Sequence, residues 1–165
     1  MAVRLDQPEL ERRLFAELSL AQSASTPELR RALGVSQPSF SRLVKQIAWL
    51  ELFGRLIANT DMHGGNLSFR VKGSRVEALA PVYDMLPAHY AGQQGHLGSA
   101  VFRPPSPAPA FAGFWDPASR AALDLWLRLA KHASVSLPFR RIAAQNAELV
   151  EAFRKAARLL PGPTS

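Results

Sequence analysis

The chain of 165 residues contains no cysteine, and this absence excludes two kinds of structure. Without thiols it has neither a disulfide framework nor a thiolate metal site, and such a composition is typical of a reducing compartment. No apolar run approaches the ~20 residues that a membrane-spanning helix needs. The N-terminal sequence MAVRLDQPELERR carries too many charges for a secretory signal peptide. We therefore expect a cytoplasmic protein without a membrane partner.

Acidic residues are scarce as well. Thirteen Asp and Glu residues stand against 20 Lys and Arg residues, which gives a net charge of +7 and a pI of about 10.8. This balance favours a polyanionic partner, and nucleic acid is the usual one. Because Arg dominates Lys, a second interpretation stays open, namely an Arg-rich surface encoded by a genome of high GC content. The hydrophobic fraction of 47% supports a packed core and argues against global disorder.

A helix, a glycine turn and a second helix are predicted near the N-terminus. Thr26 is a suitable N-cap and Pro27 a suitable first residue for a helix that stops at Gly34. Ser36 then caps a second helix with apolar residues at helical spacing. This order is typical of the helix-turn-helix motif of DNA-binding proteins. The predicted core residues of the motif are Leu29, Leu33, Val35, Phe40 and Leu43.

The second of these helices would present polar and basic side chains outward, as a recognition helix does. Gln37 and Ser39 lie at its N-terminal end, where base contacts usually fall. Arg42 and Lys45 are the expected phosphate contacts. The stretch GVSQPSFSRLV resembles the winged helix-turn-helix modules of bacterial regulators, but no strand pair follows directly to form a wing. The alternative interpretation is a helical hairpin whose polar face is simply solvated.

Periodicity and cap residues predict the remaining elements, which make the chain mostly α-helical with one small β-hairpin. They are helices at residues 8–20 and 49–60, strands at 67–71 and 75–84, a helix that Asp116 caps and that ends near His132, and a helix that Ser136 caps and that ends near Leu160. The Gly- and Pro-rich stretch at residues 89–114 is expected to be irregular.

The most informative stretch is NTDMHGGN, in which Asp61 and Asn66 stand in a D-x-x-x-x-N spacing. Kinase-type phosphoryl-transfer enzymes use such a pair: the Asp orients or deprotonates the attacking hydroxyl, and the Asn holds Mg²⁺. A second acidic metal ligand usually follows a short β-hairpin, and Asp84 follows the two predicted strands. Asn66 and Asp84 would supply the hard oxygen ligands that Mg²⁺ prefers. The alternative is an ordinary turn, because Asp and Asn are common beside Gly.

LIANTDMHGGNLSF followed by LAPVYDMLPA resembles the C-terminal lobe of HipA-family serine/threonine kinases, the toxins of HipBA-type toxin–antitoxin systems. The resemblance covers roughly residues 49–155. It implies that Asp61 is the catalytic Asp, that Asn66 and Asp84 are metal ligands, and that His63 supports the loop. It also implies Mg²⁺ and ATP as cofactors, DNA-bound antitoxins as partners, and aminoacyl-tRNA synthetases as substrates of some members. One branch of the family has a helix-turn-helix on the same chain.

A kinase also needs a phosphate-covering loop, a strand-borne Lys and an acidic partner for that Lys, all of which precede the catalytic loop. Lys45 is the only lysine before Asp61, and it lies on the predicted recognition helix. We therefore expect a helix-turn-helix without a wing at residues 1–48, joined to a partial kinase-like lobe at residues 49–160. Kinase activity of this chain alone should be very low, and the missing kinase portion or an antitoxin is an expected partner. The second hypothesis is a small DNA-binding regulator whose C-terminal part is structural.

Overall fold

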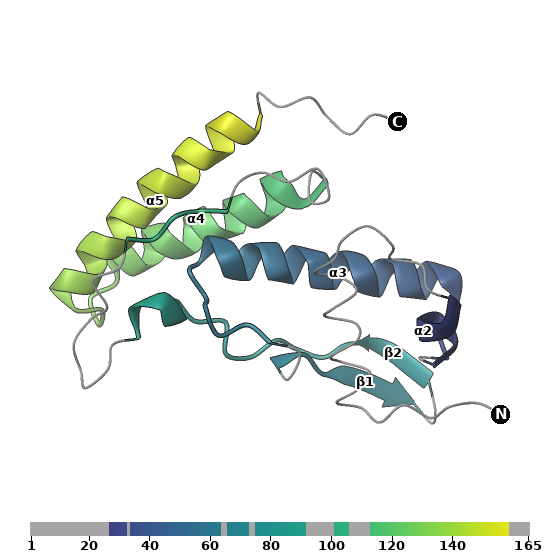
Figure 1. Ribbon diagram of the computed structural model, residues 1–165. Coiled ribbons are helices and arrows are strands. Elements are labelled where there is room, and N and C mark those ends of the chain that lie inside the picture. The colour runs from purple at the N-terminus through teal and green to yellow at the C-terminus, as the bar shows by residue number, and fades with distance from the viewer. Residues whose placement is uncertain are drawn as a thin grey trace. The chain divides into compact units, whose positions relative to one another are not determined.

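The structure is a computed structural model. It describes residues 27–32, 34–63, 66–72, 75–91, 101–105 and 113–158. Its elements are α2 (Pro27–Ala32), α3 (Gln37–Leu56), β1 (Phe69–Lys72), β2 (Arg75–Leu79), the 3-10 turn η2 (Ala88–Tyr90), α4 (Trp115–Lys131) and α5 (Leu137–Ala157), as Figure 1 shows. The prediction of a mostly helical chain with one small hairpin is confirmed. The predicted helix at residues 8–20 lies outside the described residues. None of the described helices combines the length and the apolar character needed to cross a membrane.

The chain divides into two compact units. The first unit contains residues 1–48 and 62–85, and the second contains residues 49–61 and 86–165. The first stretch of the first unit ends at residue 48, and the β1–β2 hairpin groups with the same unit. The assignment of a helix-turn-helix domain and of a kinase-like lobe at residues 49–160 stays a prediction.

In the first unit, the turn between α2 and α3 has the geometry that its residues predict. Gly34 has φ of 64°, in the left-handed region that glycine adopts without steric cost, and its N–H donates to the carbonyl of Arg31 at 3.0 Å. The Ser36 hydroxyl accepts a hydrogen bond from the N–H of Ser39 at 3.4 Å, so Ser36 caps α3 as expected. Of the five predicted core residues, Phe40 and Leu43 are buried and Val35 is half-buried, while the side chains of Leu29 and Leu33 lie outside the described residues.

The helix α3 is continuous over a stretch that the sequence divides into two helical segments. No Pro or Gly separates Ile47 from Trp49, so nothing in the sequence interrupts the backbone hydrogen bonds there. The helix ends at Leu56 rather than at Thr60, because the following residues form a C-terminal cap.

The strands β1 and β2 form an antiparallel two-stranded sheet. Phe69 pairs with Leu79 at its open end, and Lys72 pairs with Arg75 at its closed end. A bulge interrupts the register between Arg70 and Val71. Both strands are shorter than predicted, and residues 80–85 continue without regular structure.

The core of the second unit is aromatic. The side chain of Trp126 on α4 is fully buried, and its ring lies 6.3 Å from the rings of Tyr90 and Phe102 and 6.5 Å from that of Phe139. These separations are typical of favourable aromatic pairs. The Tyr90 hydroxyl lies 3.1 Å from Oδ1 and 2.8 Å from Nδ2 of Asn146 on α5, and burial raises the pKa of Tyr90 although this hydrogen bond opposes the shift.

The caps of α4 and α5 differ from each other in how well they were predicted. Ser136 caps α5, because its hydroxyl accepts from the N–H of Phe139 at 3.5 Å. The expectation that Asp116 caps α4 is wrong, since the helix already begins at Trp115 and Phe114 occupies the N-cap position. Asp116 instead lies in the first turn, where the positive end of the helix dipole favours a carboxylate.

Candidate functional site

The loop NTDMHGGN begins at a well-defined helix end. Ala58 adopts φ of 59°, and its N–H donates to the carbonyl of Arg55 at 3.3 Å. The N–H of Asn59 donates to the carbonyl of Gly54 at 2.9 Å. This pair of hydrogen bonds is the Schellman motif, which satisfies carbonyls that the end of a helix leaves without partners. The chain therefore leaves α3 in a fixed direction, just ahead of Asp61.

Asn59 then holds the backbone of Asp61. Its side chain is buried, and its Oδ1 accepts from the N–H of Asp61 at 3.0 Å, which is an Asx turn. The side chain of Asp61 is exposed. Sequence reasoning did not name Asn59 as a site residue. The sequence feature that could have indicated it is an Asn two positions before the candidate catalytic Asp, a spacing that permits an Asx turn.

Two further contacts within the second unit fix the end of α3. The Trp126 indole donates its Nε1–H to the carbonyl of Leu56 at 3.0 Å, and the N–H of His89 donates to the carbonyl of Ala58 at 2.9 Å. Both are contacts between segments far apart in the sequence, so composition and local spacing do not predict them. They tie the start of the loop to the aromatic core.

One turn of α3 before this end carries a buried carboxyl group. The side chain of Glu51 is 3% exposed and forms an ion pair with Arg55. Burial raises the pKa of Glu51, and the charge and hydrogen bond of Arg55 oppose that shift.

The second half of the loop is closed by a backbone hydrogen bond. The N–H of Asn66 donates to the carbonyl of His63 at 3.0 Å. The backbone of His63 therefore contacts that of Asn66, while the predicted supporting role of the His63 side chain stays a prediction. Both side chains reach the surface, His63 fully and Asn66 in part.

The β1–β2 hairpin brings the segments of Asn66 and Asp84 to the same end. Asn66 precedes β1 and Asp84 follows β2, and the pair Phe69–Leu79 lies at the open end of the sheet. The N–H of Ala80 donates to the carbonyl of Ser68 at 2.7 Å, which extends the contact between the two segments beyond the strands.

Asp84 is exposed and has φ of 54°, in the left-handed region. Asp is one of the few residues besides Gly that adopt this conformation, and such outliers concentrate at functional positions. Because of this backbone conformation, the Asp84 side chain points in a different direction from the one it would take in an extended segment.

Asp61 belongs to the second unit and Asn66 and Asp84 to the first, so the convergence of the three side chains stays a prediction. Over the described residues, no three or more His, Asp or Glu side chains gather to hold a metal by themselves. The donor types of Asn66 and Asp84 nevertheless fit Mg²⁺, which takes one or two protein oxygens and completes its shell with water and phosphate.

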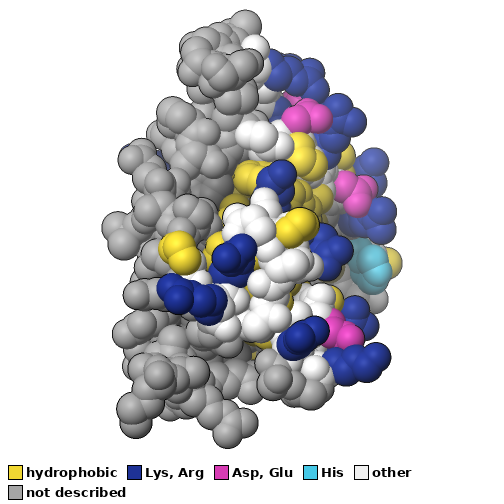
Figure 2. All heavy atoms as spheres, turned by 90° about the vertical axis from the view of Figure 1, so that its right-hand side faces the viewer, with side chains coloured by type: hydrophobic (Ala, Val, Ile, Leu, Met, Phe, Trp, Pro, Cys, Tyr) yellow, Lys and Arg dark blue, Asp and Glu magenta, His cyan; other side chains and the backbone are white. Residues whose placement is uncertain are grey.

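The predicted DNA-contacting residues lie at and near the start of α3. Gln37, Arg42 and Lys45 are exposed, and Ser39 is half-buried. The hydroxyls of Ser36 and Ser39 lie 3.1 Å apart and are hydrogen-bonded, so Ser39 is partly engaged within the protein. Figure 2 shows a face of the molecule on which Lys and Arg side chains outnumber acidic ones.

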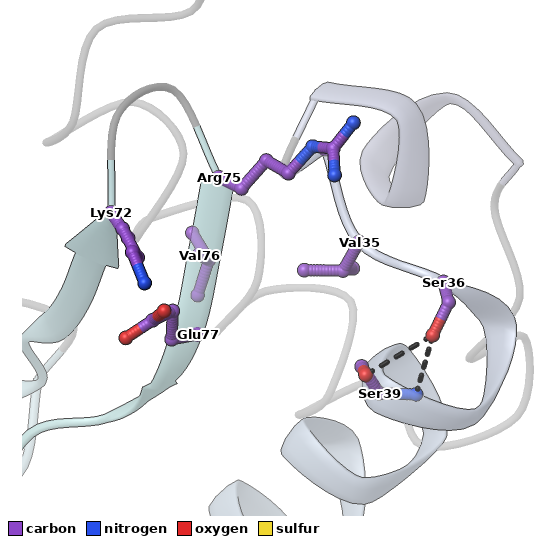
Figure 3. A pocket seen from close by; sticks show the side chains of 8 residues that line it. Val35, Ser36, Ser39, Lys72, Arg75, Val76 and Glu77 are labelled. Atoms are coloured by element: carbon purple, nitrogen blue, oxygen red, sulfur yellow. Dashed lines mark hydrogen bonds between the residues drawn. The ribbon is translucent and has the colours of Figure 1, made fainter.

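An open hollow of about 600 Å³ lies between the α2–α3 turn and the hairpin, within the first unit. It is lined by Gly34, Val35, Ser36 and Ser39 from the turn and α3, and by Lys72, Arg75, Val76 and Glu77 from the hairpin (Figure 3). Sequence reasoning assigned no role to Lys72 or Arg75. Their signal was weak, because two cations around a tight turn are common on any protein surface.

Residues 10–157 match the family of HipA-like C-terminal domains. The chain belongs to this family. It is also 35% identical over 142 residues to Toxin YjjJ of Escherichia coli (strain K12), an alignment that covers 85% of this chain and 32% of that protein. The chain thus spans about a third of the length of this curated relative. No solved structure matches the chain.

The HipA-like match is longer than the resemblance predicted from residues 49–155. It includes the loop NTDMHGGN, the hairpin and Asp84, and it also includes most of the stretch predicted to form a helix-turn-helix. Membership of the HipA-like family therefore rests on nearly the whole chain, while the helix-turn-helix stays a prediction.

Proposed function

We propose that this HipA-like chain contributes the hydroxyl-orienting and Mg²⁺-binding part of a protein serine/threonine kinase of toxin–antitoxin type. The observation that carries the proposal is the hairpin, which brings the segments of Asn66 and Asp84 to one end. The name of the Escherichia coli relative supports the toxin role.

In this proposal each residue has a distinct role. Asp61 orients the attacking hydroxyl of the substrate and accepts its proton, and Asn59 holds the Asp61 backbone in place. Asn66 and Asp84 hold Mg²⁺, and His63 orders the turn before Asn66. When bound, Mg²⁺ neutralises negative charge on the transferred phosphoryl group of ATP.

We propose that the remaining kinase portion supplies the nucleotide clamp, because the chain spans about a third of its relative. Positioning and electrostatics supply most of the catalysis in phosphoryl transfer, so the chain alone should transfer phosphate very slowly or not at all. A protein hydroxyl is the proposed acceptor; aminoacyl-tRNA synthetases and a DNA-bound antitoxin are the substrate and partner that the family resemblance implies.

Metal binding tests the proposal without requiring catalysis. The chain should unfold at a higher temperature with millimolar Mg²⁺ and ATP than without them, since a ligand that binds only the folded state stabilises it. Asp84→Ala should abolish this shift, and Asn66→Ala should reduce it. Glu148→Ala removes an exposed carboxylate from α5 and serves as the matched control. Equal shifts in wild type and Asp84→Ala would contradict the assignment of the metal ligands.

We propose a second function, binding of duplex DNA, because Gln37, Arg42 and Lys45 are all exposed on α3. In that case the protein is a small regulator and its C-terminal part is structural. A gel shift with duplex DNA should weaken steeply with salt, and Arg42→Ala with Lys45→Ala should weaken it further. Binding that is independent of both salt and this double substitution would contradict the second function.

A further inference from the structure

We propose that the tip of the β1–β2 hairpin and the α2–α3 turn together form a groove for the phosphate backbone of duplex DNA. The proposal rests on the DNA-binding function and adds a second contact surface to α3. Its central residues, Lys72 and Arg75, belong to the hairpin whose other end carries the segments of Asn66 and Asp84.

Two exposed cations lie at the closed end of the sheet, where Lys72 and Arg75 are register partners. In Figure 3 their side chains diverge, and that of Arg75 extends toward the α2–α3 turn. Neither side chain forms an ion pair with another described residue. The pair therefore presents cations at two separate points, as contacts to a phosphate backbone require.

Three consecutive residues of β2 line the hollow, namely Arg75, Val76 and Glu77. Glu77 is the extra residue of the bulge, because it lies between Val76, which pairs with Val71, and Ala78, which pairs with Arg70. Figure 3 shows the Arg75 side chain reaching from β2 toward the α2–α3 turn.

The opposite wall is short and polar. Val35 faces the hairpin across from Val76, and the hydrogen-bonded hydroxyls of Ser36 and Ser39 mark the start of α3 (Figure 3). The described lining of the hollow therefore combines two valines, two hydroxyls, two cations and one carboxylate. Glu77 also lines the hollow and would repel an anion. Removing its charge should therefore strengthen the binding of an anion.

The charge beyond the hollow favours a long polyanion over a small phosphate compound. Among the side chains that the structure describes in the first unit, seven are basic and two are acidic. The basic ones are Arg30, Arg31, Arg42, Lys45, Arg70, Lys72 and Arg75, and the acidic ones are Glu77 and Asp84. The basic residues come from α2, α3 and both strands rather than from one point of the unit. A phosphate backbone meets such a spread of charge, whereas a single small anion does not.

Fluorescence anisotropy of a labelled duplex DNA with the full chain tests the groove. Lys72→Ala with Arg75→Ala should weaken binding at least ~10-fold at low salt and reduce the slope of log K against log salt by about 1.8, the value for two lost phosphate contacts. Glu77→Gln should strengthen binding, because Glu77 is the one acidic residue among the described lining of the hollow. The matched control is Lys131→Ala with Arg141→Ala, which removes two exposed cations from the second unit.

The outcomes separate this proposal from the two functions above. If Arg42→Ala with Lys45→Ala weakens binding but the hairpin variant behaves like the control, the groove is wrong and DNA binding stands. If wild type binds no duplex even at low salt, both are wrong and the kinase assignment is untouched. If inorganic tripolyphosphate binds wild type but not the hairpin variant while DNA binding is unchanged between them, the groove serves a small anion and the proposal is overturned.

Discussion

The two units of the chain treat their positive charge differently. In the second unit, Asp116 lies 2.8 Å from Nε of Arg120, 3.3 Å from Nη2 of Arg154 and 3.4 Å from Nη2 of Arg158. Arg128 pairs with Asp124, and Arg55 pairs with the buried Glu51. In the first unit, none of the described Lys and Arg side chains forms an ion pair with another described residue.

This difference indicates two uses for the same residue types. In the second unit, Arg154 and Arg158 join the end of α5 to the start of α4. Among the described residues of the first unit, no cation forms such an ion pair. The overall charge of +7 conceals this division.

The largest change in stability is expected in the aromatic core of the second unit. Trp126→Ala removes a fully buried ring and the hydrogen bond to Leu56, and it should lower the free energy of unfolding by about 3–5 kcal/mol. Trp126→Phe keeps most of the ring volume but leaves the Leu56 carbonyl without its indole partner, which should cost about 1–3 kcal/mol. Urea denaturation measures both. A smaller loss in the Ala variant than in the Phe variant would contradict this account of the core.

The next effect concerns charge pairing in the second unit. Partial desolvation alone would raise the pKa of Asp116, but hydrogen bonds from Arg120, Arg154 and Arg158 and the charge of Arg120 lower it. The stabilisation that this carboxylate provides is therefore present above its unfolded-state pKa of 3.8 and is lost as pH falls through the lower folded-state value. Asp116→Asn should lower the thermal midpoint at pH 7, and the difference from wild type should shrink in strong acid.

The control for that substitution is Asp124→Asn, which breaks a single exposed pair with Arg128. Exposed pairs contribute at most about 1 kcal/mol, so its midpoint should change little. If Asp124→Asn lowered the midpoint as much as Asp116→Asn, the three-arginine cluster would have no special structural role.

A smaller effect, of opposite sign, is expected in the first unit. Lys72→Ala relieves the repulsion with Arg75 and should leave stability unchanged or raise it by about 0.2–1 kcal/mol at low salt. The gain should diminish at high salt, because exposed charges are screened. A clear loss of stability would show that Lys72 stabilises the folded chain. The two units would then not differ in how they use their cations.

An effect of similar size is expected at the end of α3. Ala58 adopts a left-handed conformation that costs an L-residue about 1–2 kcal/mol, and Gly avoids this cost while losing more entropy on folding. Ala58→Gly should therefore stabilise the chain by about 0.5–1 kcal/mol in a urea titration. Ala156→Gly, at an exposed helical position of α5, should destabilise it by a similar amount.

The sequence predicted local features well where caps and turns have characteristic residues. Gly34, Ser36 and Ser136 have the roles assigned to them, and the hairpin lies where alternating residues placed it. Asp116 was misassigned because Asp before Pro resembles an N-cap, whereas the helix extends one residue earlier and long-range arginines engage the carboxylate.

The candidate site rests on sequence and stays a prediction. Residue types and spacing point to Asp61, Asn66 and Asp84, since kinase-type phosphoryl transfer uses those groups in that order. The support from Asn59 and Trp126 could not be derived, because both depend on which distant backbone atoms the fold brings near. The pairing of Lys72 with Arg75 depends on the exact register of the strands, which sequence alternation leaves uncertain by a residue.

The hairpin also has a consequence for chain entropy. Asn66 and Asp84 are separated by a segment whose ends would rarely meet in a flexible chain, and the entropy of closing such a loop opposes any ligand that must touch both residues. Because Phe69 pairs with Leu79, the entropy of closing this loop is lost when the hairpin folds and not when a ligand binds. Removing one residue from each strand would preserve this closure, whereas weakening the pairing would transfer the cost to the ligand and lower its affinity without altering either contact residue.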